Sequence, residues 1–168
     1  GHTQFIPTSY LQFAVDFTGD GRRDIWSEDP TDALASTAAY LARSGWQTGQ
    51  LWGAEVRLPP GFDIGQTGRE ARRASSDWAA MGVRAADGGA LPDHGPGAVV
   101  LPQRPTGPAF LLWRNFNVIL RYNNALNYGI GVGHLSDRLR GGGPIRAAFP
   151  PEAQGLTLAD RQELQRRL

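Results

Sequence analysis

Residues 4–24 read QFIPTSYLQFAVDFTGDGRRD, and this stretch contains both the helix start and the loop that decide the fold. Pro7 is followed by two residues, Thr8 and Ser9, that are common as helix N-caps. Apolar residues then recur at helical spacing as far as Asp16. We therefore expect a short helix, capped by Thr8 or Ser9, directly before Asp16.

The residues after this helix have the oxygen spacing of an EF-hand-like calcium loop. Counted from Asp16, oxygen side chains occupy positions one, three, five and nine, and glycine occupies position six; these are Asp16, Thr18, Asp20, Asp24 and Gly21. Alternate residues of a tight loop converge their oxygens on one point, and oxygen ligands suit a hard cation. The spacing therefore predicts a calcium site.

Two positions of the loop modify this prediction. Arg22, at the seventh position, offers only its backbone carbonyl, and Ser27 stands at the twelfth position, where a bidentate glutamate is typical. Asp29 or Asp32, where the next helix begins, can supply the last carboxylate. The alternative is an Asp- and Gly-rich turn that is capped by its own side chains and needs no metal. A calcium ion here would be structural, because no evident nucleophile adjoins the loop.

Beyond the loop the sequence predicts an α+β fold. Residues 31–43 should form a helix capped by Thr31 or Asp32, with Pro30 before it and Gly45 after it. Further helices are expected at 67–73, 76–81, 116–122 and 125–140, and strands at 51–58, 98–101 and 110–113. Residues 82–97 should form a Gly- and Pro-rich loop, residues 144–155 resemble a linker, and Thr157 should cap a last helix.

The composition excludes several classes of function. The 168 residues are enough for one core, and no apolar run approaches the roughly 20 residues of a membrane span. The net charge of +1 does not suggest a nucleic-acid partner, so none is expected. Without cysteine the chain has neither disulfides nor thiol chemistry.

Residues 1–10 and 121–128 combine aromatic with amide side chains. Aromatic rings cover the apolar C–H faces of pyranoses, while Gln and Asn both donate and accept hydrogen bonds to hydroxyl and N-acetyl groups. Sugar binding is therefore one interpretation. The other is that these residues are satisfied core and turn positions.

The order of these pieces resembles the membrane-bound lytic murein transglycosylase B family over most of the chain. The matching pieces are residues 4–10, 14–21, 26, 32–40, 45–46 and 121–123, with Tyr128. The resemblance implies a mainly α lysozyme-like core with a small β-rich insertion. The expected divisions are core at 1–49, insertion at 50–112, core again at 113–143, a linker at 144–155, and the start of a possible peptidoglycan-binding domain at 156–168.

The same resemblance implies two sets of site residues. Those expected to bind the glycan are Gln4, Phe5, Tyr40, Tyr122, Asn123 and Tyr128. Those expected to hold calcium are Asp16, Thr18, Asp20, the carbonyl of Arg22, and Asp32. The implied partner is the glycan strand of peptidoglycan, in the periplasm of a Gram-negative bacterium, with any outer-membrane anchor on a segment outside this chain.

Family members cleave the β-1,4 bond between N-acetylmuramic acid and N-acetylglucosamine without water and leave 1,6-anhydro ends. One glutamate, in a Glu-Ser/Thr-x-aromatic-Gly context, acts as acid and then as base. The five glutamates here lack that context; they are Glu28, Glu55, Glu70, Glu152 and Glu163. In the family that glutamate lies on an earlier helix, upstream of the Gln-Phe motif, so the resemblance implies a catalytic glutamate before Gly1 and no turnover by this chain alone. The alternatives are a non-catalytic glycan-binding module with structural calcium, or a calcium-stabilised domain without sugar affinity.

Overall fold

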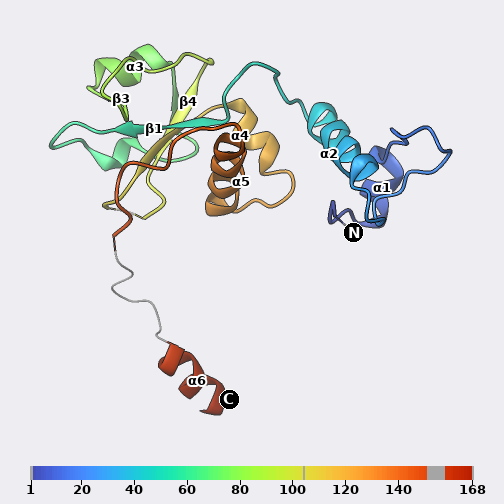
Figure 1. Ribbon diagram of the computed structural model, residues 1–168. Coiled ribbons are helices and arrows are strands. Elements are labelled where there is room, and N and C mark those ends of the chain that lie inside the picture. The colour runs from blue at the N-terminus through green and yellow to red at the C-terminus, as the bar shows by residue number, and fades with distance from the viewer. Residues whose placement is uncertain (1, 104, 151–157, 168) are drawn as a thin grey trace.

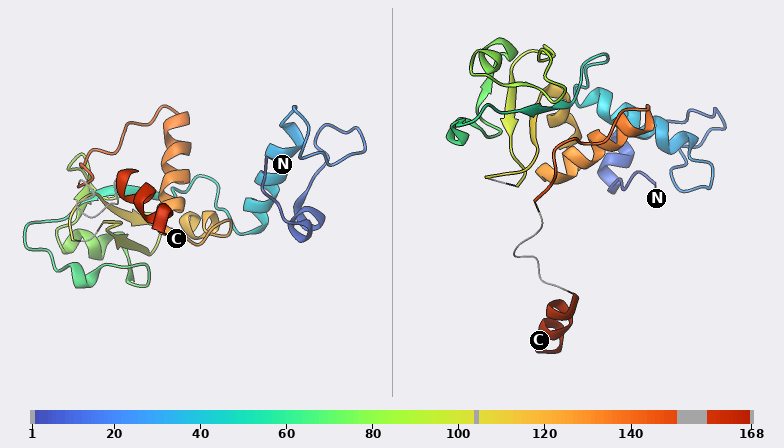
Figure 2. Two further views of the ribbon diagram at one scale, coloured as in Figure 1. Left: turned by 90° about the horizontal axis from the view of Figure 1, so that it is seen from below. Right: turned by 60° about the vertical axis from the view of Figure 1, so that its left-hand side comes forward.

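The computed structural model describes residues 2–103, 105–150 and 158–167. Its helices are α1 (Pro7–Phe13), α2 (Thr31–Arg43), α3 (Ser75–Ala80), α4 (Arg114–Ile119), α5 (Leu126–Leu139) and α6 (Leu158–Arg167), with a 3-10 helix η1 at Ile64–Gln66. Its strands are β1 (Gly53–Arg57), β2 (Arg72–Arg73), β3 (Arg84–Ala85), β4 (Gly97–Val100) and β5 (Ala109–Leu112). Helices α1 and α2 lie on one side of the molecule and the sheet with α3 on the other, with α4 between them (Figures 1 and 2).

The five strands form an antiparallel sheet in the order β2-β4-β5-β1-β3. All residues of β4 and β5 are buried, so the sheet is covered on both faces there. Leu111 belongs to a core cluster with Trp78 and Trp113, whereas its neighbours Phe110 and Leu112 belong to a second cluster. Because successive strand residues point to opposite faces, these short runs are continuously apolar.

Helix α5 packs against the second cluster through glycines. A Cβ on Gly133 would lie 2.3 Å from the Trp52 ring, and one on Gly129 would lie 2.6 Å from the Phe116 ring. One turn beyond Gly133, Asp137 accepts a hydrogen bond of 2.8 Å from the Trp52 indole N–H. Residues at i, i+4 and i+8 share one helix face, so the indole lies flat along this face and is anchored at its end.

The segment 44–52, which connects α2 to the sheet, is held by the fully buried side chain of Asn115. Its carboxamide oxygen accepts from the backbone N–H of Gln47 at 2.8 Å. Its amide group donates to the carbonyls of Gln47 and Gln50, both at 2.9 Å. One side chain thus replaces the secondary structure that this segment lacks.

We expect Asn115→Ala to destabilise the fold by about 1–3 kcal/mol, because the truncation leaves three partly buried backbone groups without partners. Chemical denaturation of the variant and the wild type measures this difference. Asn117→Ala, an exposed position on the same helix, serves as the control and should change stability by less than about 0.5 kcal/mol. Equal midpoints for the wild type and Asn115→Ala would contradict the role given to Asn115.

Most predicted elements are confirmed, including the helix at Thr31–Arg43, but the predicted caps are wrong. Ile6 is the N-cap of α1 and Pro30 is the N-cap of α2, and neither cap makes a side-chain hydrogen bond. Proline at the first turn of α1 removes one N–H that would need a partner. Before α2, the Asp29 carboxylate accepts hydrogen bonds from the backbone N–H and the hydroxyl of Thr31. Asp32 does not cap the helix and instead accepts hydrogen bonds from the preceding loop.

The predicted helix at 67–73 is also wrong. Backbone pairing with β4 draws Arg72 and Arg73 into β2, and only the short η1 is helical nearby. Similarly, the expected loop at 82–97 contains β3, because Arg84 and Ala85 pair with β1. In both places tertiary pairing overrides local propensity.

The segment that follows α5 lies partly on the sheet. The backbone N–H groups of Arg146 and Ala147 donate to the carboxylate of Glu55 at 2.8 and 2.7 Å. This part of the predicted linker is therefore tied to β1, whereas Thr157 lies outside the described residues. In the part of the chain that the structure describes, no helix has the length and apolar character needed to cross a bilayer.

Candidate functional site

A cavity of about 630 Å³ lies between the N-terminal residues, α2, the segment 44–52 and α5. Three of the six residues predicted to bind glycan line it: Gln4, Tyr122 and Tyr128. Sequence reasoning gave no cavity role to the other lining residues, among them Thr37, Leu41, Trp46, Trp52, Ser136 and Arg140. Of these residues, Trp46 is one that the sequence could have indicated, because it lies in one of the pieces that resemble the family.

Phe5 and Tyr40 lie behind the cavity wall, in an aromatic cluster with Tyr122. The ring of Tyr40 is 4.6 Å from that of Tyr122 and 4.8 Å from that of Phe13, measured between centroids. Phe5 is 5.7 Å from Tyr40 and 6.3 Å from Tyr122. These contacts hold the Tyr122 ring in place, so Phe5 and Tyr40 support the wall from behind.

Tyr122 occupies a protected position in this wall. Burial raises the pKa of its phenol, while the neighbouring hydroxyl of Thr37 acts in the opposite direction. That Thr37 hydroxyl donates to the Ala33 carbonyl at 3.0 Å. Among the residues that the structure describes, none makes a well-formed hydrogen bond with the buried Tyr122 hydroxyl. Tyr122 therefore stays a neutral phenol at physiological pH.

Gln4 and Asn123 flank the aromatic residues. Gln4 has a φ of 52°, the one positive value for a non-glycine residue in the described ranges. Such a conformation is uncommon outside glycine and often marks a functional position. Asn123, next to Tyr122, is exposed and does not line the cavity. Its role in glycan binding stays a prediction.

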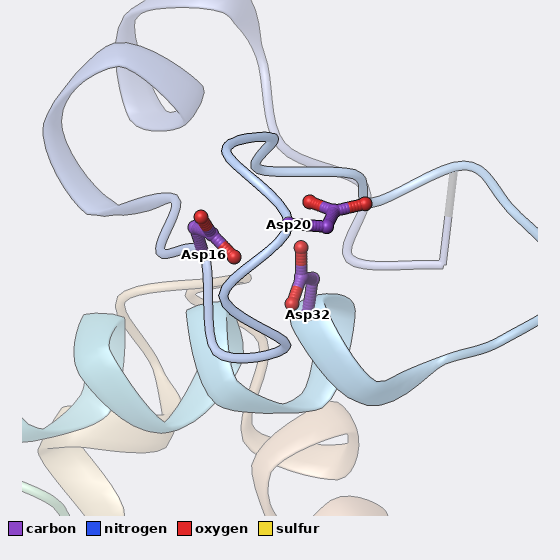
Figure 3. Close-up of side chains that lie close together, drawn as sticks. All are labelled: Asp16, Asp20 and Asp32. Atoms are coloured by element: carbon purple, nitrogen blue, oxygen red, sulfur yellow. The ribbon is translucent and has the colours of Figure 1, made fainter.

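Three carboxylates of the predicted calcium loop come together (Figure 3). Asp16, Asp20 and Asp32 each place an oxygen within 4.8 Å of the others. Among the described residues, no arginine forms an ion pair with any of the three. Carboxylates this close repel one another unless a cation lies between them.

The loop folds around Asp16, whose side chain accepts hydrogen bonds from within the turn. Its two carboxylate oxygens accept from the N–H groups of Gly19 and Gly21 at 2.6 and 2.8 Å, and Thr18 directs its hydroxyl to the same carboxylate at 3.4 Å. Gly19 and Gly21 have φ values of 78° and 85°, which other residues rarely adopt. Asp20 accepts from the Arg22 N–H at 2.8 Å.

Asp32 joins the loop to α2. It is only 4% exposed, and it accepts from the N–H groups of Phe17, Thr18 and Asp24 at 2.9, 3.1 and 3.0 Å. Burial acts to raise the pKa of Asp32, but these N–H groups together hold it below its ordinary value, so the carboxylate stays ionised. Asp32 thus takes part in the cluster, as the resemblance implied.

Asp24, at the ninth position of the spacing, does not join the cluster. One of its oxygens accepts from the N–H groups of Trp26 and Ser27 at 2.8 and 3.1 Å and closes the turn before α2. The donor set of this site therefore consists of hard oxygen atoms on Asp16, Asp20 and Asp32, which is the kind of donor that calcium prefers.

The described geometry agrees with a comparison to protein families. The model of the transglycosylase SLT domain matches residues 1–137. This chain belongs to that family. The match covers the calcium-type loop, the aromatic cluster and all residues that line the cavity except Arg140.

Individual members of the transglycosylase SLT domain family are also similar to the chain. Membrane-bound lytic murein transglycosylase B of Escherichia coli (strain K12) is 33% identical over 143 residues, which are 80% of this chain and 36% of that protein. The chain therefore spans little more than a third of that relative.

Solved structures of the family show the same fold. SltB3 from Pseudomonas aeruginosa, in complex with NAG-anhNAM-pentapeptide, is 50% identical with a TM-score of 0.86, over 99% of this chain and 45% of that one. The Escherichia coli lytic transglycosylase SLT35, in complex with calcium, is 28% identical with a TM-score of 0.62, over 82% of this chain and 42% of that one. The lysozyme-like α+β fold is thereby confirmed.

Proposed function

We propose that this chain forms a glycan-binding wall and the calcium loop of a lytic transglycosylase that cleaves the β-1,4 bond between MurNAc and GlcNAc in peptidoglycan. The observation that carries the proposal is the cavity, whose wall combines Gln4 with the rings of Tyr122 and Tyr128. Such a wall offers ring faces to the C–H faces of a pyranose and an amide to its N-acetyl group. The solved SltB3 complex contains NAG-anhNAM-pentapeptide, a fragment of peptidoglycan, which supports the choice of substrate.

The proton-transferring group is proposed to lie outside this chain. In the described ranges no aspartate or glutamate lines the cavity. Asp137 follows the lining residue Ser136 in sequence, and its carboxylate accepts hydrogen bonds from the side chains of Trp52 and Arg140, which line the cavity. The residues in hand thus bind and orient the sugar, while a glutamate elsewhere protonates the leaving oxygen and then takes the proton of the 6-hydroxyl.

Products released from purified sacculi test this reaction. The intact protein should release muropeptides with 1,6-anhydro ends, which mass spectrometry distinguishes from reducing ends by the loss of one water. Reducing ends would show a hydrolase instead. No released product, together with retained binding to sacculi, would favour the non-catalytic glycan-binding module.

Two substitutions on α5 test the binding surface. Tyr128→Ala removes a ring from the cavity wall, and we expect it to weaken chitooligosaccharide binding roughly tenfold, as the loss of a stacking contact does. Leu135→Ala is the control, because Leu135 is exposed on the same helix and does not line the cavity. Calorimetric titration gives both affinities. An unchanged affinity for Tyr128→Ala would place the glycan elsewhere.

We also propose that calcium is the cation of the carboxylate cluster. Asp16, Asp20 and Asp32 would hold it, with the hydroxyl of Thr18 and the carbonyl of Arg22 as further oxygen donors. Support comes from the spacing of the loop and from the solved calcium complex of SLT35, a similar protein. Bound calcium would neutralise the three carboxylates and brace the loop between α1 and α2.

The proposed location is the periplasm of a Gram-negative bacterium, where peptidoglycan lies. The similar Escherichia coli protein is named a membrane-bound lytic murein transglycosylase, which agrees with this location.

A further inference from the structure

The loop between α4 and α5, residues 120–125, carries Tyr122 and Asn123 and accepts hydrogen bonds from two side chains of other segments. From α2, the Tyr40 hydroxyl donates to the carbonyl of Arg121 at 3.0 Å. From the segment between η1 and β2, the Arg69 guanidinium donates to the side-chain oxygen of Asn124 at 3.0 Å. Asn123 lies between the two held residues and is exposed.

The segment that carries Arg69 is itself attached to the sheet. The N–H of Gly68 donates to the carbonyl of Val99 in β4 at 2.8 Å. The neighbouring Thr67 is buried, and its hydroxyl donates to the carbonyl of Ile64 at 2.7 Å. Gly68 has a φ of 139°, which turns the chain outward at Arg69. The backbone that carries Arg69 is therefore fixed to the sheet.

We propose that Arg69 is a positioning residue for glycan binding, acting through the loop that presents Asn123. This inference rests on the proposed function. A short exposed loop samples several conformations unless side chains tether it, and each conformation that misplaces the Asn123 amide lowers the fraction of molecules competent to bind. Tyr40 restrains the start of the loop, and Arg69 restrains its end from the β-rich part of the chain.

The test is a mutant cycle on glycan binding by the intact protein. Arg69→Ala should weaken the affinity for chitooligosaccharides about three- to tenfold, which corresponds to the loss of one ordinary, solvent-exposed hydrogen bond. Asn124→Ala should weaken it to the same extent, and the double variant should be no weaker than either single variant. Arg69→Lys, which keeps one charged donor, should recover part of the loss.

A second cycle separates positioning from a merely structural role. In an Asn123→Ala background, Arg69→Ala should cost nothing further, because the residue it positions is already absent. The matched control is Arg72→Ala, since Arg72 bonds to the carbonyl of Pro96 and not to the loop. We expect its affinity to equal that of the wild type, and all variants should share the same melting temperature within about 2 °C.

The outcomes distinguish this inference from the function on which it rests. If the wild type binds no glycan, the proposed function fails. If the wild type binds and Arg69→Ala binds equally well, only the positioning role fails. Additive losses in the Asn123→Ala background would likewise overturn it, because they would mean that Arg69 acts without Asn123.

Discussion

Gly133→Ala is expected to destabilise the protein by at least about 3 kcal/mol, which corresponds to a fall in melting temperature of roughly 6–12 °C for a domain of this size. The new Cβ would lie 2.3 and 2.5 Å from two atoms of the Trp52 ring. The indole cannot turn away cheaply, because its N–H is bonded to Asp137 and its ring packs against Phe110 and Phe116. Helix α5 must therefore move away from the sheet.

The matched control is Gly131→Ala on the same helix, where nothing lies within 4 Å of the added Cβ. Alanine there should stabilise the protein by about 0.5–1 kcal/mol, because glycine loses more backbone entropy in a helix. Thermal unfolding of the two variants gives changes of opposite sign. If both variants gained stability, the close packing of α5 on Trp52 would be wrong.

Asp32→Ala is expected to weaken calcium binding by about a hundredfold or more. The substitution removes one of three clustered carboxylates and leaves the N–H groups of Phe17, Thr18 and Asp24 without their shared acceptor. The calcium-free variant should therefore also melt below the wild type. Calorimetric titration after removal of metal by a chelator measures the affinity.

Asp20→Asn separates the two effects of Asp32→Ala. Asp20 is exposed, and an asparagine oxygen can still accept from the N–H of Arg22. The calcium-free melting temperature should stay close to that of the wild type, while calcium affinity falls about tenfold. A wild-type melting temperature that does not respond to calcium or to chelator would contradict the proposed site.

The sequence predicts the elements whose local signals agree with their tertiary setting. The helix at 31–43 is rich in alanine and leucine, with a proline before it and a glycine after it, and the structure has the same bounds. The short strands β4 and β5 were visible as apolar runs because both of their faces are buried. By contrast, β2 and β3 are two residues long and exist only through their partners, so no local pattern could reveal them.

The candidate site was predictable in part for a similar reason. Oxygen spacing indicated the loop around Asp16, since its hydrogen bonds are local. Asp32 lies outside that spacing; Ser27 at the twelfth position pointed to Asp29 or Asp32 as the last carboxylate, and the family resemblance favoured Asp32. The role of Trp52 could not be predicted, because its neighbours Gly133 and Asp137 are more than 80 residues away in sequence. In addition, glycine has a low helix propensity, so the sequence pattern gives no sign that Gly133 serves to pack a helix closely.

The cavity draws its wall from both ends of the described fold, from His2 to Arg140. Between these ends the chain contains the sheet, in which β1 pairs with β5, followed by α4 and α5. Contacts this distant in sequence form slowly, because long loops must close before the contacts can stabilise them. On the ribosome the wall therefore cannot exist until α5 has emerged. The proposed glycan binding would therefore require a chain that has been synthesised past the last residue of the wall.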